Sequence, residues 1–261
     1  MKLSVSNIGW TEQEDEQVYA LLAKLGFCGI EAAPTRIRKE QPYLHKEAAA
    51  AFASEMNEKG FCVPSMQSIW FGHTENIFGT KEEKAALYDY TCAAIAFSAA
   101  AHCPNLVFGC PKNRNLPQGA KPEDAAPFFH EIAAVAAANG VVLALEANPA
   151  IYNTNFLNTT EEAFAYADYL ACNGIGVNLD FGTIVQNKED LSGVAKNIKL
   201  VSHVHISEPF LAPIEPRLQH KELATLLCEL GYNKFVSLEM KAAASLQTLA
   251  DAASYLAEVF G

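Results

Sequence analysis

The chain has 261 residues, of which 50% are hydrophobic, and its formal net charge is −11. This length and apolar content suit one large core, and a single (β/α)₈ domain typically has about 250 residues. The negative charge argues against nucleic acid and acidic membrane surfaces as partners, because both would repel the protein.

The first half of the chain alternates short apolar runs with longer helical segments. Thr11 followed by Glu14 forms a capping-box pattern, which predicts the start of the first helix. In chain order we expect a strand at Lys2–Ile8, a helix at Thr11–Leu25, a strand at Phe27–Ala32, a helix at His45–Lys59, a strand at Cys62–Ile69, a helix at Lys81–Ala101, a strand at Asn105–Gly109 and a helix at about Glu123–Asn139.

The second half continues the same alternation, and its first strand is almost wholly apolar, which is typical of a strand buried on both faces. In chain order we expect a strand at Val141–Asn148, a helix starting near Thr160, a strand at Ile175–Asp180, a short helix around Asp190–Lys196, a strand at Leu200–His205, a helix at about Gln219–Leu230, a strand at Phe235–Glu239 and a last helix capped by Ser245.

Eight strands alternating with helices, without a break in composition, predict an α/β protein with one (β/α)₈ TIM-barrel domain over residues 1–261. A doubly wound open sheet is the alternative, but no strand is followed by a G-x-G-x-x-G motif or a P-loop. A glycine that can end a helix in the left-handed conformation recurs just before a strand. These glycines are Gly26, Gly60, Gly140, Gly174 and Gly231.

Each of the last four strands ends on an acidic or imidazole side chain. The carboxyl ends of barrel strands meet at one rim, so we expect these four side chains to converge there. Carboxylate and imidazole ligands without thiolate favour Mn²⁺, Co²⁺ or Mg²⁺, and they are also compatible with Zn²⁺. For any single residue, a loop carboxylate paired with a neighbour is an equally good interpretation. The predicted metal ligands are Glu146, Asp180, His205 and Glu239.

The motifs GFCGIEA, LALEANP, VNLDFGT, SHVHISEP and VSLEMK together resemble the sugar phosphate isomerase/epimerase superfamily, the xylose isomerase-like TIM barrels. The resemblance covers essentially the whole chain and implies a metal bound by the four strand-end residues. It also implies that His205 is the ligand and that His203, on the same face, lies deeper or supports the site.

The resemblance implies a divalent-metal-dependent isomerase or epimerase of a small sugar or sugar-like polyol. In such enzymes the cation chelates a carbonyl and a neighbouring hydroxyl, acidifies the C–H bond between them and stabilises the enediolate. By resemblance, Glu146 and Glu239 would be the catalytic pair that moves the proton from opposite faces of the substrate.

Three positions depart from the pattern of related enzymes. Many members have a histidine where this chain has Thr183. Ketose 3-epimerases have a second glutamate where it has Tyr152, and an arginine where it has Leu211. The metal ligands are therefore kept while the substrate contacts differ. The endonuclease branch would need a histidine-rich cluster for three zinc ions, which this acidic chain with seven histidines does not suggest.

Polar side chains near the predicted rim are candidates for substrate binding, each with a structural alternative such as a loop ion pair or a packed loop. A lysine or arginine there could hold a carboxylate or phosphate, and an amide or carboxylate could bind a hydroxyl. His73 could belong to a lid over the substrate with Trp70 and Phe71. Glu31 is a weaker candidate for substrate binding. The substrate-binding candidates are Lys112, Arg114, Glu208, Lys241, Gln67, His73 and Asn148.

Two other functions stay open: a lyase of the inosose dehydratase kind, which could use the same enediolate, and a sugar-binding protein without turnover. The seven cysteines include no CxxC pair, and the acidic N-terminal region is unlike a secretory signal, so we expect a cytoplasmic protein. The expected partner is a small-molecule sugar or polyol. The sequence does not define the substrate, its phosphorylation state, the physiological metal or whether the chain forms a homo-oligomer.

Overall fold

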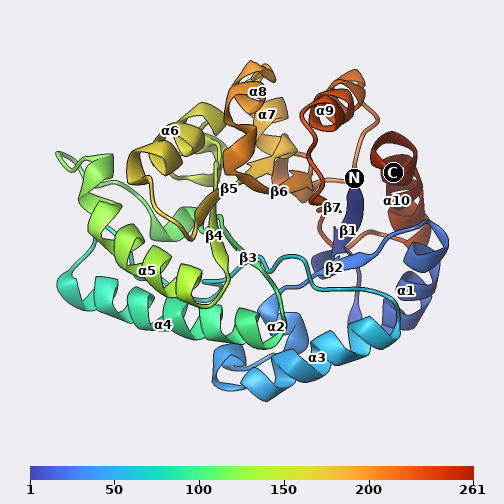
Figure 1. The fold of residues 1–261 in the computed structure, drawn as a ribbon, viewed down its shortest axis with the longest axis horizontal. Coiled ribbons are helices and arrows are strands. Elements are labelled where there is room, and N and C mark those ends of the chain that lie inside the picture. The colour runs from blue at the N-terminus through green and yellow to red at the C-terminus, as the bar shows by residue number, and fades with distance from the viewer.

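The computed structural model describes residues 1–261 and contains one curled, wholly parallel sheet. The strand order is β2-β1-β7-β6-β5-β4-β3, and helices surround the strands in Figure 1. This arrangement confirms the expected TIM-barrel fold. The strands are β1 (Lys2–Ser6), β2 (Gly29–Glu31), β3 (Asn105–Phe108), β4 (Val142–Glu146), β5 (Ile175–Asp180), β6 (Val201–Ile206) and β7 (Phe235–Leu238).

The predicted strand at Cys62–Ile69 is not a regular strand, so this prediction was wrong in detail. The segment lies between β2 and β3 and forms only isolated bridges, with Met66 paired to both Ala32 and Leu106. Pro64 has no backbone N–H and therefore interrupts a continuous ladder at this place. The segment still joins the two edges of the sheet and completes the wall of the barrel.

Ten α-helices connect the strands. They are α1 (Asp15–Lys24), α2 (Pro34–Ile37), α3 (Lys46–Glu58), α4 (Lys81–Ala100), α5 (Ala126–Ala138), α6 (Thr160–Leu170), α7 (Phe181–Asn187), α8 (Ser192–Asn197), α9 (Leu218–Glu229) and α10 (Leu246–Phe260). The short helices α2 and α7 were not predicted. Helix α7 begins directly after β5 because Asp180 caps it, accepting a hydrogen bond from the Thr183 amide. The Ser245 cap of α10 is confirmed.

The five glycines predicted to end helices all have positive φ angles, between 68° and 88°. Gly174 shows the requirement most clearly. Its φ is +88°, and a Cβ atom there would lie 2.3 Å from the carbonyl oxygen of Ala133. The other four directly follow the capping residue of a helix and turn the chain into the next strand. Contrary to the prediction, Gly174 does not end a helix, because α6 already ends at its capping residue Ala171, which is itself left-handed.

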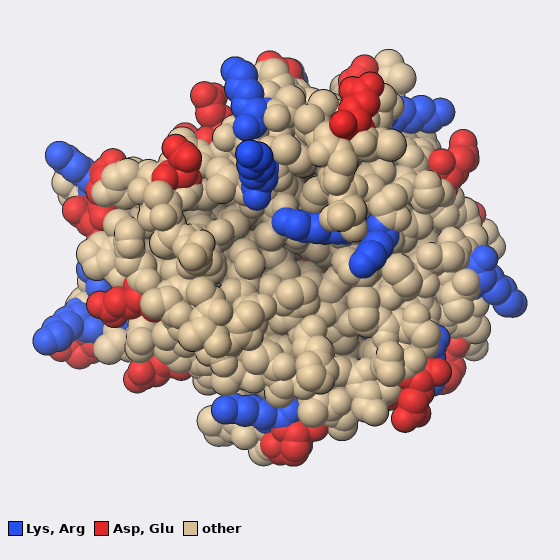
Figure 2. All heavy atoms as spheres, in the orientation of Figure 1, with Lys and Arg blue, Asp and Glu red and all other residues tan.

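The sheet packs against the helices through a cluster of 63 buried hydrophobic residues. None of the helices combines the length and the apolar character that crossing a bilayer requires. On the face drawn in Figure 2, aspartates and glutamates lie mainly around the outline of the molecule. The middle of that face is largely uncharged, with several lysine and arginine side chains above its centre.

The strand register places the ends of β4 to β7 within two residues of one another. Glu146 pairs with Asn178, Asp180 pairs with His205, and the next residue, Ile206, pairs with Leu238. The polar strand ends therefore lie at one rim although they are far apart in the sequence.

Candidate metal centre and active-site cavity

Four side chains meet at this rim: Glu146 from β4, Asp180 from β5, His205 from β6 and Glu239 from the residue after β7. One possible ligand atom from each lies within 4.8 Å of those of the other three. His205 is fully buried, and the two glutamates are less than a tenth exposed. The structure brings the four predicted residues together, and their role as metal ligands stays a prediction.

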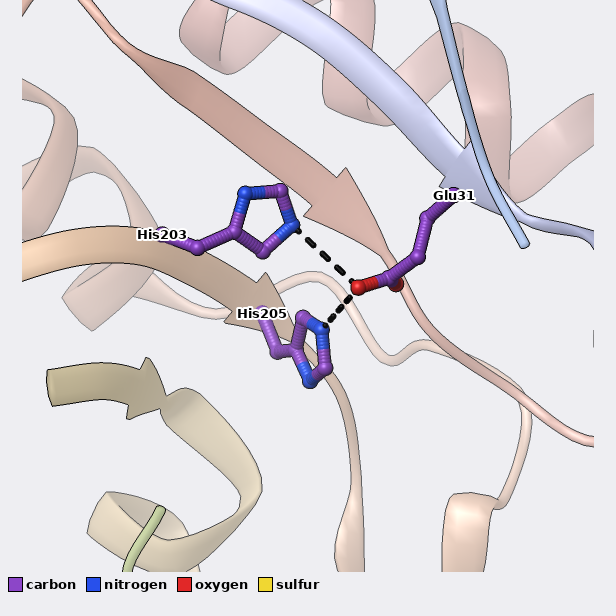
Figure 3. A group of neighbouring side chains, drawn as sticks. All are labelled: Glu31, His203 and His205. Carbon is purple, nitrogen blue, oxygen red and sulfur yellow. Dashed lines mark hydrogen bonds and ion pairs between the residues drawn. The ribbon is translucent and has the colours of Figure 1, made fainter. Parts of the chain in front are cut away.

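Glu31, at the end of β2, fixes the orientation of the His205 ring. Its Oε1 atom lies 2.9 Å from Nε2 of His205 and 3.4 Å from Nε2 of His203. Figure 3 shows this carboxylate facing both rings. Ser237 also donates a hydrogen bond to Glu31, at 3.2 Å. Because Nε2–H of His205 donates its hydrogen bond to this carboxylate, it is Nδ1 of His205 that faces the other acids.

Nδ1 of His205 lies 3.2 Å from Glu146 Oε1 and 3.1 Å from Glu239 Oε2. It is buried, yet no group of the protein forms a hydrogen bond of good geometry with it. An imidazole nitrogen left without a partner among three carboxylates is a suitable donor set for one divalent cation. The residues present therefore fit a metal ion.

The pKa values show how strongly this cluster favours positive charge. Burial raises the pKa of Glu239 to about 7. Burial and the neighbouring Glu146 carboxylate raise the pKa of Asp180 to about 6. Burial by itself would lower the pKa of His205, but the carboxylates of Glu239 and Glu31 outweigh it and raise that pKa well above its usual range. A proton or a metal cation would each relieve the repulsion between the acids.

The Glu146 carboxylate is held on both oxygens. Asn148 donates to Oε2 at 3.0 Å, and Asn178 donates to Oε1 at 2.6 Å. Gly109 makes room for it, because a Cβ atom there would lie 2.7 Å from Oε2. Asn148 was predicted from the sequence as a site residue, whereas Asn178 was not. Asn178 is two residues before Asp180, so the alternation of β5 places both on the same side of the sheet.

Asp180 is held in a similar way. Its Oδ1 accepts a hydrogen bond from Ser207, and its Oδ2 accepts from the backbone N–H of Thr183 at 2.8 Å. The Thr183 hydroxyl oxygen lies 3.0 Å from the same Oδ2. Ser207 was also missed, although it follows His205 by two residues. Thr183, one of the three departures from the family pattern, thus orients the aspartate through its backbone N–H, and its hydroxyl donates to the Ala147 carbonyl oxygen.

A cavity of about 210 Å³ opens beside the four residues. Three predicted substrate-binding residues line it, namely Gln67, Asn148 and Glu208. Two of the three departures from the family pattern, Tyr152 and Leu211, line it as well. The charged side chains that line it are all carboxylates. They are Glu146, Asp180, Glu208 and Glu239.

Arg217 neutralises one of these acids, since it contacts both carboxylate oxygens of Glu208 at 2.8 and 2.6 Å. Gln67 donates to the Ser6 hydroxyl at 3.2 Å. Tyr152 is half-buried and its hydroxyl accepts a hydrogen bond from the Phe210 amide. The wall of the cavity is thus built from fixed polar groups suited to hydroxyls.

Arg114 does not face the cavity, and this correction concerns a residue predicted to bind substrate. Its side chain is fully buried and donates to the carbonyl oxygens of Glu146 and Leu157, at 2.8 and 3.3 Å. Burial lowers its pKa to about 10. The guanidinium therefore supports the chain on either side of the metal-binding strand end, and a substrate would have no access to it.

The other three basic candidates do not line this cavity either. His73 and Lys112 line a neighbouring one. His73 lies 3.0 Å from Glu75 and packs against the Tyr90 ring, with 3.9 Å between ring centroids. Lys241 is exposed, lines neither cavity, and its backbone N–H donates to the Leu211 carbonyl oxygen.

Of the two aromatic residues predicted to form a lid with His73, only one is exposed. Trp70 is buried and its Nε1 donates to the Thr91 hydroxyl at 2.9 Å, so it belongs to the core. Phe71, by contrast, has 73% of its side-chain surface exposed.

Comparison with known proteins places this site in a family context. The model of the xylose isomerase-like TIM barrel matches residues 19–259. No curated protein matches the chain at a significant level. Among solved structures, the D-psicose 3-epimerase of Clostridium cellulolyticum H10 with D-tagatose is 16% identical, with a TM-score of 0.78 over 100% of this chain and 99% of that one.

Two further structures share the fold. The 3-keto-D-glucoside 4-epimerase of E. coli is 19% identical, with a TM-score of 0.76 and 98% of each chain covered. The IOLI protein with a bound zinc atom is 14% identical, with a TM-score of 0.75 over 100% of this chain and 98% of that one. At these identities the likeness concerns the fold.

Proposed function

Because the chain belongs to the xylose isomerase-like TIM barrel family, we propose that it is a divalent-metal-dependent isomerase or epimerase of a small sugar or sugar-like polyol. Glu146, Asp180, His205 and Glu239 would hold the cation. The observation that carries this proposal is the buried, partnerless Nδ1 of His205 among three carboxylates. When bound, a divalent cation supplies Lewis-acid polarisation of a substrate carbonyl.

The proton transfer is assigned to Glu146 and Glu239, which face Nδ1 of His205 at similar distances. Glu146 accepts hydrogen bonds from Asn148 and Asn178, which hold its oxygens in place. Glu239 is buried and also lines the cavity, so its carboxylate can reach a substrate bound there. One glutamate would remove the proton next to the carbonyl, and the other would return a proton from the opposite side.

The charges around the cavity favour an uncharged substrate. No lysine, arginine or histidine lines the cavity to pair with a phosphate or carboxylate, whereas hydroxyls can donate to carboxylates and to the oxygen of Gln67 or Asn148. We therefore assign a neutral ketose, aldose or polyol to the cavity beside the metal centre. Mn²⁺, Co²⁺ and Mg²⁺ suit these ligands, and Zn²⁺, as in the IOLI structure, is compatible.

Deuterium exchange tests the reaction. The protein would be loaded with Mn²⁺, Co²⁺, Mg²⁺ or Zn²⁺ in D₂O and mixed with a panel of ketoses, aldoses and inososes. Wash-in of deuterium next to the carbonyl, without loss of water from the sugar, is the expected result. Loss of water would point to a dehydratase, and binding without any exchange would point to a sugar-binding protein; either result would contradict the proposal.

We assign this activity to residues 1–261 as one barrel domain acting in the cytoplasm on a small molecule. Self-association of the chain would be compatible with it, since the four proposed ligands all come from one chain.

A further inference from the structure

A second cavity adjoins the one beside the metal centre. It has a volume of about 450 Å³ and is formed mainly by the segments around Trp70–Thr74 and Cys110–Asn113. Ser68, Cys110 and Pro111 line both cavities. The two cavities therefore share one wall, and an elongated ligand that passes over these three residues would reach both.

The shared wall has an unusual backbone. Ser68 and Cys110 both have left-handed conformations, with φ angles of 57° and 42°, although neither is glycine. Such conformations are unfavourable for residues with a Cβ atom, and they tend to occur where a ligand site requires a particular backbone course. Ser68 also donates a hydrogen bond to Gln67, which lines the inner cavity.

The outer cavity differs from the inner one in the side chains that it offers. Phe71 lines this cavity and exposes 73% of its surface, so its ring is accessible to a ligand. Lys112, also exposed, lines the same cavity with a side chain that can donate three hydrogen bonds. An exposed aromatic face next to a polar donor is the arrangement that suits a sugar ring, whose C–H face is apolar and whose edge carries hydroxyls.

We propose that the outer cavity is a subsite for a second sugar ring, so that the chain acts on a glycosylated ketose and not only on a free monosaccharide. This inference rests on the proposed function, which places the reacting ketose in the inner cavity. The glycosidic oxygen would lie over Cys110 and Pro111, with the second ring against Phe71 and one of its hydroxyls near Lys112.

The test compares D-fructose with isomaltulose, in which a glucosyl ring is attached to O6 of fructose and the carbonyl end is free. Binding of each sugar to the Mn²⁺-loaded protein would be measured by calorimetry, for the unmodified chain and for Phe71→Ala. We expect isomaltulose to bind more tightly than fructose and Phe71→Ala to weaken isomaltulose binding roughly two- to tenfold while fructose binding is unchanged. Tyr169→Ala, which removes another exposed aromatic residue far along the chain on α6, should change neither.

The inference is overturned if fructose binds as tightly as isomaltulose, if Phe71→Ala affects both sugars alike, or if neither sugar binds. Deuterium wash-in, recorded on the same samples, tests the proposed isomerase or epimerase activity separately from the second-ring subsite. Deuterium exchange with no preference for isomaltulose would contradict the subsite and support the isomerase activity. A Phe71-dependent preference for isomaltulose without deuterium exchange would support the subsite and contradict the isomerase activity.

Discussion

Replacing Glu31 by glutamine should weaken metal binding without unfolding the protein. Glu31 is fully buried, 2.9 Å from Nε2 of His205, and accepts a second hydrogen bond from Ser237 at 3.2 Å. Glutamine has nearly the same volume but no charge, so it accepts a weaker hydrogen bond from the imidazole and makes Nδ1 a poorer ligand. Loss of such a carboxylate behind a metal-bound histidine typically lowers metal affinity about 10- to 100-fold, or about 1.4–2.7 kcal/mol.

Titration of the metal-free protein with Mn²⁺ or Zn²⁺ by calorimetry measures this change. Glu47→Gln is a matched control, because Glu47 also contacts a histidine, His45, at 3.1 Å, but on the surface. Circular dichroism would verify that both variants are folded. Equal metal affinity for Glu31→Gln and the unmodified chain would refute the role that we give to Glu31.

Three further predictions concern the cavity and the pH dependence of stability. Glu239→Gln should reduce turnover about 10²- to 10⁴-fold, with no loss in melting temperature, because burying the charged carboxylate is unfavourable; normal turnover would exclude its role in proton transfer. Gly109→Ala should weaken metal binding by displacing Glu146, whereas Gly193→Ala, with no atom within 4 Å of the new Cβ, should not, and titration with Mn²⁺ would distinguish them. Burial lowers the pKa of His220 to about 4, so the unfolded chain, with a value near 6.5, binds the proton first as the pH falls. This residue's contribution to stability should therefore decrease by about 2 kcal/mol between pH 7 and pH 5, and His220→Gln should show a correspondingly smaller decrease in urea unfolding; an equal decrease would contradict this assignment.

The strand ends could be predicted because their signal is local. Buried parallel strands are continuous apolar runs, and each of the last four runs stops at a polar residue that the barrel brings to one rim. The alternation of β5 and β6 could also have identified Asn178 and Ser207, which lie two residues from predicted ligands and hold Glu146 and Asp180. Residues two positions apart on a strand face the same side of the sheet, so each predicted ligand points to such a neighbour.

Other features depend on contacts between distant segments, which no local pattern reveals. Arg114 lies in a polar loop sequence that is typical of a solvated rim, yet the chain folds back over it and buries the guanidinium against the Leu157 carbonyl oxygen. Glu31 and His205 are 174 positions apart, and their hydrogen bond depends on β2 facing β6 across the barrel. The apolar run at Cys62–Ile69 resembles a strand, but Pro64 limits it to isolated bridges.

The central claim is that four strand-end residues form one metal centre. Elemental mass spectrometry of the purified protein and of His205→Ala, after each has been incubated with Mn²⁺, Co²⁺, Mg²⁺ or Zn²⁺ and desalted, tests it most directly. The account predicts about one divalent ion per chain in the unmodified protein, as one four-ligand site requires, and a clear loss in the variant. No metal in either protein, or the same amount in both, would contradict the account.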